Sequence, residues 1–159
     1  MEQFTGTRPL ADAQAFDSAA LTAWLRARLP GFAGPLDVAQ FKGGQSNPTF
    51  KLTTPAATYV LRAKPGPAAK LLPSAHAIER EYRVMAALRT QGVPVPEMLA
   101  LCEDESVIGR AFYIMGFVDG RVLWNQALPD ASREERGAIY DEMNRVIAGL
   151  HKVDVKAAG

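Results

Sequence analysis

The sequence contains a single cysteine, Cys102, and only two histidines, His76 and His151. One cysteine cannot form a disulfide within the chain. Its place in an apolar run favours a small buried residue in a reduced compartment over a nucleophile. One cysteine and two histidines also cannot build a common zinc site, and no close group of carboxylates suggests another metal. The sequence therefore predicts no metal ligands.

Neither sign of charge predominates, since 18 Lys and Arg residues face 17 Asp and Glu residues for a net charge of +1. A balanced chain offers no electrostatic argument for binding nucleic acid or an anionic membrane. Aromatic residues make up 8% of the chain and are not interleaved with basic runs, which argues against a platform for single-stranded nucleic acid. We predict neither a nucleic-acid partner nor a membrane partner.

Long hydrophobic runs are also missing. The first thirty residues carry Asp12, Asp17, Arg26 and Arg28, so we expect no secretory signal there. No stretch approaches the length that a transmembrane helix needs. The expected location is the cytoplasm.

What the chain does have is enough apolar residues, 48% of 159, for the core of one domain of ordinary size. Their periodicity predicts an α+β fold built on a five-stranded, mostly antiparallel sheet with one helix inserted after the third strand. The expected strands span residues 36–42, 49–53, 59–64, 98–102 and 111–118. The expected helices span residues 18–29, 74–91 and 132–153, with a short helical piece at 122–126. Residues 1–15 are expected to form a loose arm and residues 156–159 a structureless tail.

The last predicted helix carries a broad apolar face with little sequence left to cover it. That face consists of Ile139, Met143, Val146, Ile147 and Leu150. Three interpretations stay open: the helix packs on the end of the sheet, it dimerises, or it belongs to a domain whose remainder lies outside this chain.

The third predicted strand places two cations on one face. Strand alternation puts Val60, Arg62 and Lys64 on one side, while the following helix carries Glu81 within its apolar stripe. A carboxylate on an apolar helix face is costly unless it is paired, and Arg62 is the natural partner. The pair either fixes the helix on the sheet or holds a cation for phosphate. Glu79 is expected to face outward and to pair with Arg83.

Two further stretches could contact a ligand. Residues 43–47 combine two glycines with short polar side chains, which suits either an ordinary hairpin turn or a loop that approaches a ligand through its backbone. Residues 115–120 form either a plain strand end or a backbone edge that faces a planar base. His151 reads as a structural residue at a helix C-terminus.

Taken in order, these pieces resemble a known family. The segments that carry the resemblance are residues 41–49, 59–62, 71–76, 78–84, 93–96, 102–104 and 112–115. They resemble the N-terminal lobe of the aminoglycoside phosphotransferase family, which has a protein-kinase-like fold. The closest branch is the kinase-like domain found in some acyl-CoA dehydrogenase family proteins. The resemblance spans about residues 36–153.

The resemblance implies an ATP site, with Mg²⁺ expected only in a complete protein. Arg62 would take the place of the phosphate-binding lysine and Glu81 that of its helix partner. Val60 would cover the adenine and Met115 would sit at the back of the pocket. The implied nucleotide-binding residues are Gly43, Gly44, Gln45, Ser46, Asn47, Val60, Arg62, Glu81, Met115, Gly116, Phe117 and Val118. Two residues depart from the family pattern. Arg62 replaces the usual phosphate-binding lysine, and Lys64 on the same face could share phosphate binding with it. Gly116 stands where a larger residue is usual.

The catalytic loop of the family, His-Gly-Asp, does not occur in these 159 residues. We therefore predict no catalytic residues and expect this chain alone to be incompetent for phosphoryl transfer, which depends on a metal and positioned groups. The expected division is an N-terminal arm and helix (1–35), a kinase-like nucleotide-binding lobe (36–118) and the start of a truncated second lobe (119–159). A small hydroxyl-bearing acceptor would bind only with the missing lobe. The alternative is a non-catalytic, pseudokinase-like or partner-binding module that self-associates through residues 139–150.

Overall fold

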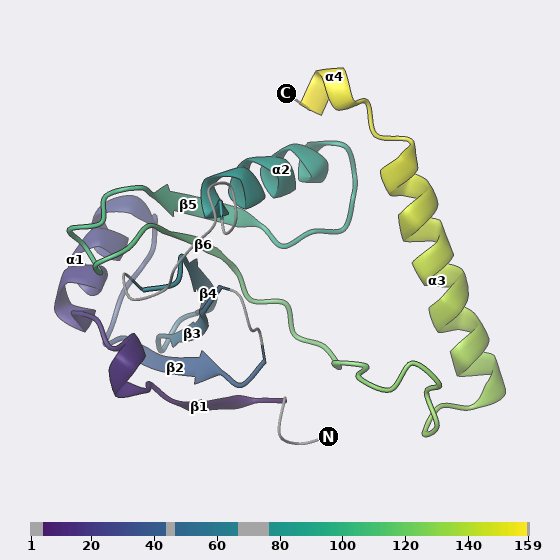
Figure 1. Ribbon diagram of the computed structural model, residues 1–159, viewed down its shortest axis with the longest axis horizontal. Helices are drawn as coiled ribbons and strands as arrows, with labels where there is room; N and C mark the ends of the chain where they lie inside the picture. Colours follow the sequence, from purple (N-terminus) through teal and green to yellow (C-terminus); the bar gives the residue numbers. More distant parts are fainter. Residues whose placement is uncertain (1–4, 44–46, 67–76, 159) are drawn as a thin grey trace.

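The computed structural model describes residues 5–43, 47–66 and 77–158 (Figure 1). In these parts of the chain, six antiparallel strands form one sheet in the order β1-β2-β3-β4-β6-β5. The strands are β1 (Thr7–Pro9), β2 (Asp37–Phe41), β3 (Thr49–Thr53), β4 (Thr58–Ala63), β5 (Met98–Cys102) and β6 (Phe112–Gly116). The helices are a 3-10 turn (Asp12–Gln14), α1 (Ser18–Arg28), α2 (Ile78–Thr90), α3 (Arg133–His151) and α4 (Val155–Ala158).

The hairpin between β3 and β4 fixes which side chains share a face of the sheet. Thr54 closes its turn: the Thr54 amide and hydroxyl both donate to the carbonyl of Ala57, at 2.9 and 3.0 Å. This turn sets Thr53 opposite Thr58, which in turn sets Thr49 opposite Arg62. Since directly opposed residues point to the same face, the register decides what surrounds Arg62.

One face of the sheet carries the main hydrophobic core, and α1 covers it. Asp17 caps this helix, because its Oδ1 accepts the amides of Ala19 and Ala20 at 2.8 and 3.0 Å. Leu21 and Leu25 of α1 are fully buried in the same cluster as Phe50 of β3. The other core members on the strands include Leu52, Leu61, Ala63, Phe112 and Ile114. The alternation predicted for β4 is confirmed, since Leu61 and Ala63 are buried on this face.

Within the described residues, α2 covers one end of the opposite face. The buried Ile78 opens this helix, and Tyr82 and Met85 pack with it against Tyr113 and Met115 of β6. This contact lies over β5 and β6. Next to this contact, α2 meets β4 at Arg62 and leaves the rest of the face that β1 to β4 contribute uncovered.

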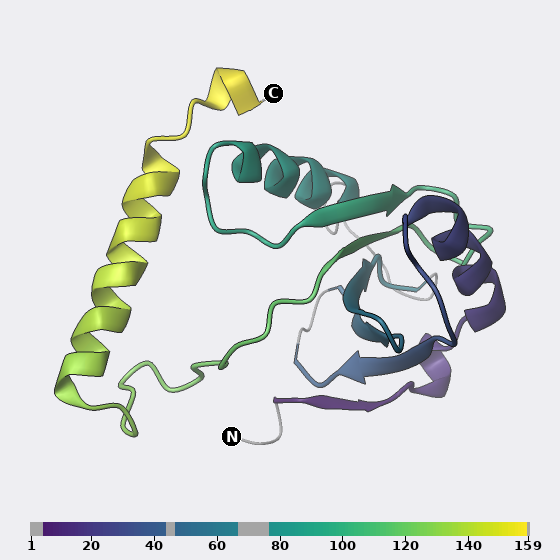
Figure 2. The same ribbon diagram turned by 180° about the vertical axis from the view of Figure 1, so that it is seen from behind.

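The long helix α3 stands to one side of the sheet, beyond an irregular linker (Figures 1 and 2). None of its residues is buried, and four of its large side chains, Tyr140, Met143, Ile147 and Leu150, are 44% to 51% exposed. Its far end is held to α2, because the side-chain amide of Gln91 and the backbone of Asp154 exchange two hydrogen bonds of 3.0 and 2.9 Å. Of the apolar face expected to be uncovered, Met143, Ile147 and Leu150 are exposed, whereas Ile139 and Val146 are partly buried. Among the helices in the described ranges, none has the length and apolar character to cross a membrane.

The predicted fold class and the antiparallel run of the first three expected strands, observed as β2, β3 and β4, are confirmed, while three local predictions are wrong. The arm at 1–15 contains β1, an edge strand too short to show alternation, with Pro9 tolerated because an edge strand can lack a donor. Residues 122–126 are not helical. The tail is not structureless, because the Oδ1 of Asp154 caps α4 by accepting the amides of Lys156 and Ala157 at 2.9 and 3.2 Å. The predicted start of α2 at Ser74 lies outside the described residues, and the observed helix begins at Ile78.

Candidate functional site

A pocket of about 620 Å³ opens on the face of the sheet that α2 leaves uncovered. We call it the sheet-face pocket. Its walls come from the sheet, from the strand exit after β6 and from the N-terminal arm. The lining residues are Thr5, Gly6, Thr7, Phe41, Gly43, Thr49, Lys51, Val60, Arg62, Pro96, Met115, Gly116, Phe117, Val118, Gly120, Val122 and Trp124. One end is apolar and the other end carries the guanidinium of Arg62.

Arg62 is held by Glu81, as the sequence predicts. Its Nε donates to Glu81 Oε2 at 2.9 Å, and the two side chains are 28% and 35% exposed. Glu81 also accepts a hydrogen bond from Asn47 Nδ2 at 3.0 Å and another from the Tyr113 hydroxyl at 3.3 Å. Burial, reinforced by the charge of Glu81, raises the pKa of Tyr113 above its ordinary value, so this hydroxyl stays protonated and donates. Glu81 thus ties α2 to β4, to β6 and to the residues just before β3.

The guanidinium of Arg62 has a second fixed contact. Its Nη1 donates to the hydroxyl of Thr49 at 3.2 Å, and that hydroxyl lies 3.2 Å from the carbonyl oxygen of Asn47. The Nη2 group donates no hydrogen bond to any residue within the described ranges. The arginine is therefore oriented on two sides and can still donate to a ligand in the pocket, with the forked geometry that suits phosphate and carboxylate.

The apolar end of the pocket lies between β4 and the strand exit. Val60 and Met115 are directly opposed in the register and both line the pocket. The ammonium of Lys51 lies over the ring of Phe117, 5.0 Å from its centroid. The amide of Gly116 is not free for a ligand, because it donates to the carbonyl of Glu97 at 2.8 Å. The backbone groups of Phe117 and Val118 make no hydrogen bond with the rest of the described chain.

Lys64 and Glu79 correct the sequence interpretation. The sequence suggested that Lys64 could share the phosphate with Arg62. It also suggested that Glu79 would pair with Arg83. In the structure, Lys64 and Glu79 form an ion pair with each other. Burial by itself would raise the pKa of Glu79, but the hydrogen bond from Lys64, a backbone hydrogen bond and the charges of Lys64 and Arg83 together hold this pKa below its usual value. Arg83 instead lies 4.0 Å from Glu103. Lys64 is not among the residues that line the pocket.

The structure gathers most of the predicted site residues. Gly43, Val60, Arg62, Met115, Gly116, Phe117 and Val118 line the sheet-face pocket. Asn47 was expected to offer its side chain to a ligand, but it is only 2% exposed and its amide binds Glu81. Glu81 lies behind Arg62 rather than on the pocket wall. Gly44, Gln45 and Ser46 lie outside the described residues.

Several lining residues escaped the sequence analysis. Thr49 and Lys51 were predictable from the hairpin register. If the turn after Thr53 pairs Thr53 with Thr58, Thr49 lies opposite Arg62 and Lys51 lies opposite Val60. Thr5, Gly6 and Thr7 gave no such signal, because a three-residue strand has no readable period. Trp124 belongs to a linker that shows no regular structure.

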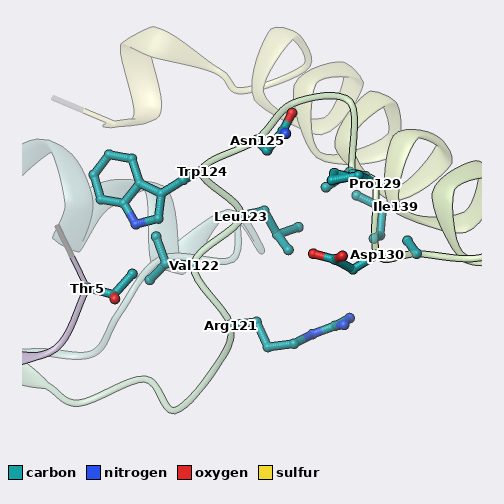
Figure 3. A pocket seen from close by; sticks show the side chains of 11 residues that line it. Thr5, Arg121, Val122, Leu123, Trp124, Asn125, Pro129, Asp130 and Ile139 are labelled. Atoms are coloured by element: carbon teal, nitrogen blue, oxygen red, sulfur yellow. The ribbon is translucent and has the colours of Figure 1, made fainter. Parts of the chain in front are cut away.

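A second hollow of about 410 Å³ adjoins the first along the linker (Figure 3). Thr5, Val122 and Trp124 line both. Figure 3 shows Trp124, Val122 and Thr5 on one side, with Leu123, Pro129 and Ile139 on the other. Arg121 at its margin is paired with Glu135 at 2.7 Å. The hollow is mainly apolar and holds no cluster of catalytic groups.

Within the described parts of the chain, the pocket is not accompanied by a metal centre. The described residues contain no group of three or more His, Cys, Asp or Glu side chains that could hold a metal ion. Cys102 is buried at 3% exposure, and burial raises the pKa of its thiol, as expected for a core residue. The chemistry that these residues can offer is the binding of an anion next to an apolar slot.

Comparisons with known proteins identify the family and the fold of this chain. A crystal structure from Ralstonia eutropha, of a "putative aminoglycoside phosphotransferase", superposes with a TM-score of 0.78 at 66% identity, over 91% of this chain and 41% of that one. Acyl-CoA dehydrogenase family member 10 of Mus musculus is 45% identical over 95% of this chain. Acyl-CoA dehydrogenase family member 11 of Gallus gallus is 45% identical over 97% of this chain.

This chain spans only 14% and 20% of the length of those two relatives. The resemblance predicted from the sequence, including the branch shared with acyl-CoA dehydrogenase family proteins, is thereby confirmed. The sequence profile of the phosphotransferase enzyme family matches residues 37–159. This chain belongs to the phosphotransferase enzyme family.

Proposed function

We propose that this chain is the nucleotide-binding lobe of an ATP-dependent small-molecule phosphotransferase. The observation that carries the proposal is the orientation of Arg62, which lines an open pocket and keeps its Nη2 group without a partner among the described residues. A purely structural ion pair needs neither the pocket nor the spare donors. The family membership of the chain supports the same conclusion.

In this proposal the triphosphate lies at the polar end, against Arg62 and the backbone at Gly43. The base occupies the apolar end, against the adjacent side chains of Val60 and Met115, with its edge toward the unpaired backbone groups of Phe117 and Val118. Both ends belong to the same pocket, so one ligand with an apolar ring and an anionic tail fits both.

These residues account for binding and not for transfer. Phosphoryl transfer needs a metal ion and a group that positions the attacking hydroxyl. The described residues do not fit Mg²⁺, because they form no ligand cluster, and no His-Gly-Asp sequence occurs in the 159 residues. We propose that a second lobe supplies these groups and the site for the hydroxyl acceptor, in keeping with the greater length of the related structure.

The proposal is tested by mapping ATP binding with amide NMR spectra. Titration with ATP should shift the amide signals of Val60, Arg62, Phe117 and Val118 in a saturable manner. The signals of Leu21 and Leu25, on the far side of the sheet, should stay in place. Shifts confined to residues outside the sheet-face pocket, or no saturable shift up to several millimolar ATP, would remove the proposed site.

The second candidate is a partner-binding module that self-associates through α3. Tyr140, Met143, Ile147 and Leu150 favour it, because these apolar side chains are 44% to 51% exposed on one helix. Light scattering of the same sample separates the two readings. If wild type is a dimer that binds no ATP, and Met143→Glu is a monomer that also binds none, the partner-binding module is supported. If wild type is a monomer that binds ATP, the nucleotide lobe is supported.

A further inference from the structure

Four residues, Arg62, Glu81, Asn47 and Thr49, form a closed ring of hydrogen bonds, in which Asn47 takes part through its side-chain amide and its backbone carbonyl. Arg62 Nε donates to Glu81, and Asn47 Nδ2 donates to the other oxygen of Glu81, at 2.9 and 3.0 Å. Arg62 Nη1 lies 3.2 Å from the Thr49 hydroxyl. This hydroxyl lies 3.2 Å from the backbone carbonyl oxygen of Asn47. The hydrogen bonds therefore connect Arg62 to Glu81, Glu81 to Asn47, Asn47 to Thr49, and Thr49 back to Arg62.

The direction of each hydrogen bond in the ring is fixed by chemistry. An arginine can only donate and a carbonyl can only accept, so the Thr49 hydroxyl must accept from Arg62 and donate to Asn47. Thr49 thereby uses its donor and one of its acceptor sites at once. Neither a valine of the same shape nor any apolar residue can close the ring.

The ring acts on the one group that the proposed function needs. A guanidinium held only at Nε can rotate about the bonds that precede it, whereas contacts at both Nε and Nη1 fix its plane. The fixed plane leaves Nη2 as the group that can meet an anion in the sheet-face pocket. Pre-orientation of this kind raises affinity because less side-chain freedom is lost on binding.

We propose that Thr49 is a positioning residue that fixes the guanidinium of Arg62 for phosphate, and that this site consequently requires arginine and rejects lysine. A lysine has one nitrogen, whose three donors diverge from a single point. It cannot reach Glu81, Thr49 and a ligand phosphate in the separate directions that Nε, Nη1 and Nη2 provide. The proposal rests on the proposed nucleotide function and deepens it, since it explains why arginine stands at this position.

The test compares wild type with Thr49→Val, Thr49→Ser and Arg62→Lys, using affinities for ATP and for adenosine. Thr49→Val should weaken ATP binding about tenfold, the loss expected for one hydrogen bond to a charged group, and leave adenosine binding unchanged. Thr49→Ser restores the hydroxyl and should restore the ATP affinity. Arg62→Lys should weaken ATP binding at least as much as Thr49→Val does.

The double variant Thr49→Val with Arg62→Lys supplies the decisive control. If Thr49 acts only through Arg62, the valine should cause no further loss of ATP affinity in the lysine background. An equal fall in adenosine affinity, an unchanged ATP affinity in Thr49→Val, or an equal loss in both backgrounds would each overturn the proposal.

Failure of the proposed function would look different. In the protein without nucleotide, the NMR signal of the Arg62 Nε–H group reports whether the hydrogen-bonded ring holds the guanidinium in place. Thr49→Val should accelerate rotation of the guanidinium in that state. Wild type that fails to bind ATP while this signal still depends on Thr49 would overturn the nucleotide function and leave the ring as a structural contact. Wild type that binds ATP with no dependence on Thr49 would overturn only the positioning role.

Discussion

Replacing Arg62 with alanine is expected to lower the affinity for ATP by about 10- to 150-fold, because a charge-assisted hydrogen bond is worth about 1.5–3 kcal/mol. The effect on folding should be small. The Arg62–Glu81 pair is partly exposed, and Glu81 keeps the donors of Asn47 and Tyr113 when the arginine is gone. We expect the free energy of unfolding to fall by no more than about 1 kcal/mol. Titration with ATP and urea unfolding on the same variant measure the two effects.

Arg145 offers the matched control for this experiment. It forms an Arg–Glu pair with Glu142 on α3, where the two side chains are 65% and 58% exposed and neither lines the pocket. Arg145→Ala should change neither the ATP affinity nor, beyond about 0.5 kcal/mol, the stability. If Arg62→Ala destabilises the fold strongly and leaves ATP binding intact, the pair is a structural tie between α2 and the sheet.

Replacing Phe50 with alanine is expected to lower the free energy of unfolding by about 3–5 kcal/mol, the cost of removing a large aromatic side chain from a packed core. Phe50 is fully buried and meets Phe16 edge to face at 5.4 Å. It also belongs to the cluster that joins the sheet to α1. Much of the stability of a domain of this size depends on one such core.

The next residue along β3 provides the comparison. Lys51 points to the opposite face, where its ammonium contacts Phe117 at the margin of the pocket. Lys51→Ala should cost about 1 kcal/mol or less in urea unfolding, the usual scale of a partly exposed cation–π contact. Similar losses for both variants would contradict the assignment of one face to the core and the other to a ligand.

The sequence predicted the central elements well because their signals are local. β3 and β5 have the expected bounds, since turns and prolines delimit them. The Arg62–Glu81 pair followed from a simple cost argument, because a carboxylate within an apolar stripe needs a partner. These predictions needed only the period of each element and the order along the chain.

The rest depended on contacts that join distant parts of the chain. Glu79 could pair with Arg83 on its own helix, but Lys64 of the sheet is the partner that the tertiary structure supplies. Asn47 looked like a ligand donor because it follows two glycines, yet Glu81 takes its amide. β1 has three residues and therefore no period, so only its pairing with β2 reveals it. A local pattern cannot choose among partners brought together by folding.

The structure of this chain bound to a non-hydrolysable ATP analogue tests the central claim most directly. We predict the base against Val60 and Met115, and a phosphate oxygen within hydrogen-bonding distance of Arg62 Nη2 while Nε still donates to Glu81. A nucleotide bound elsewhere, or bound in the sheet-face pocket with its phosphates turned away from Arg62, would contradict the account.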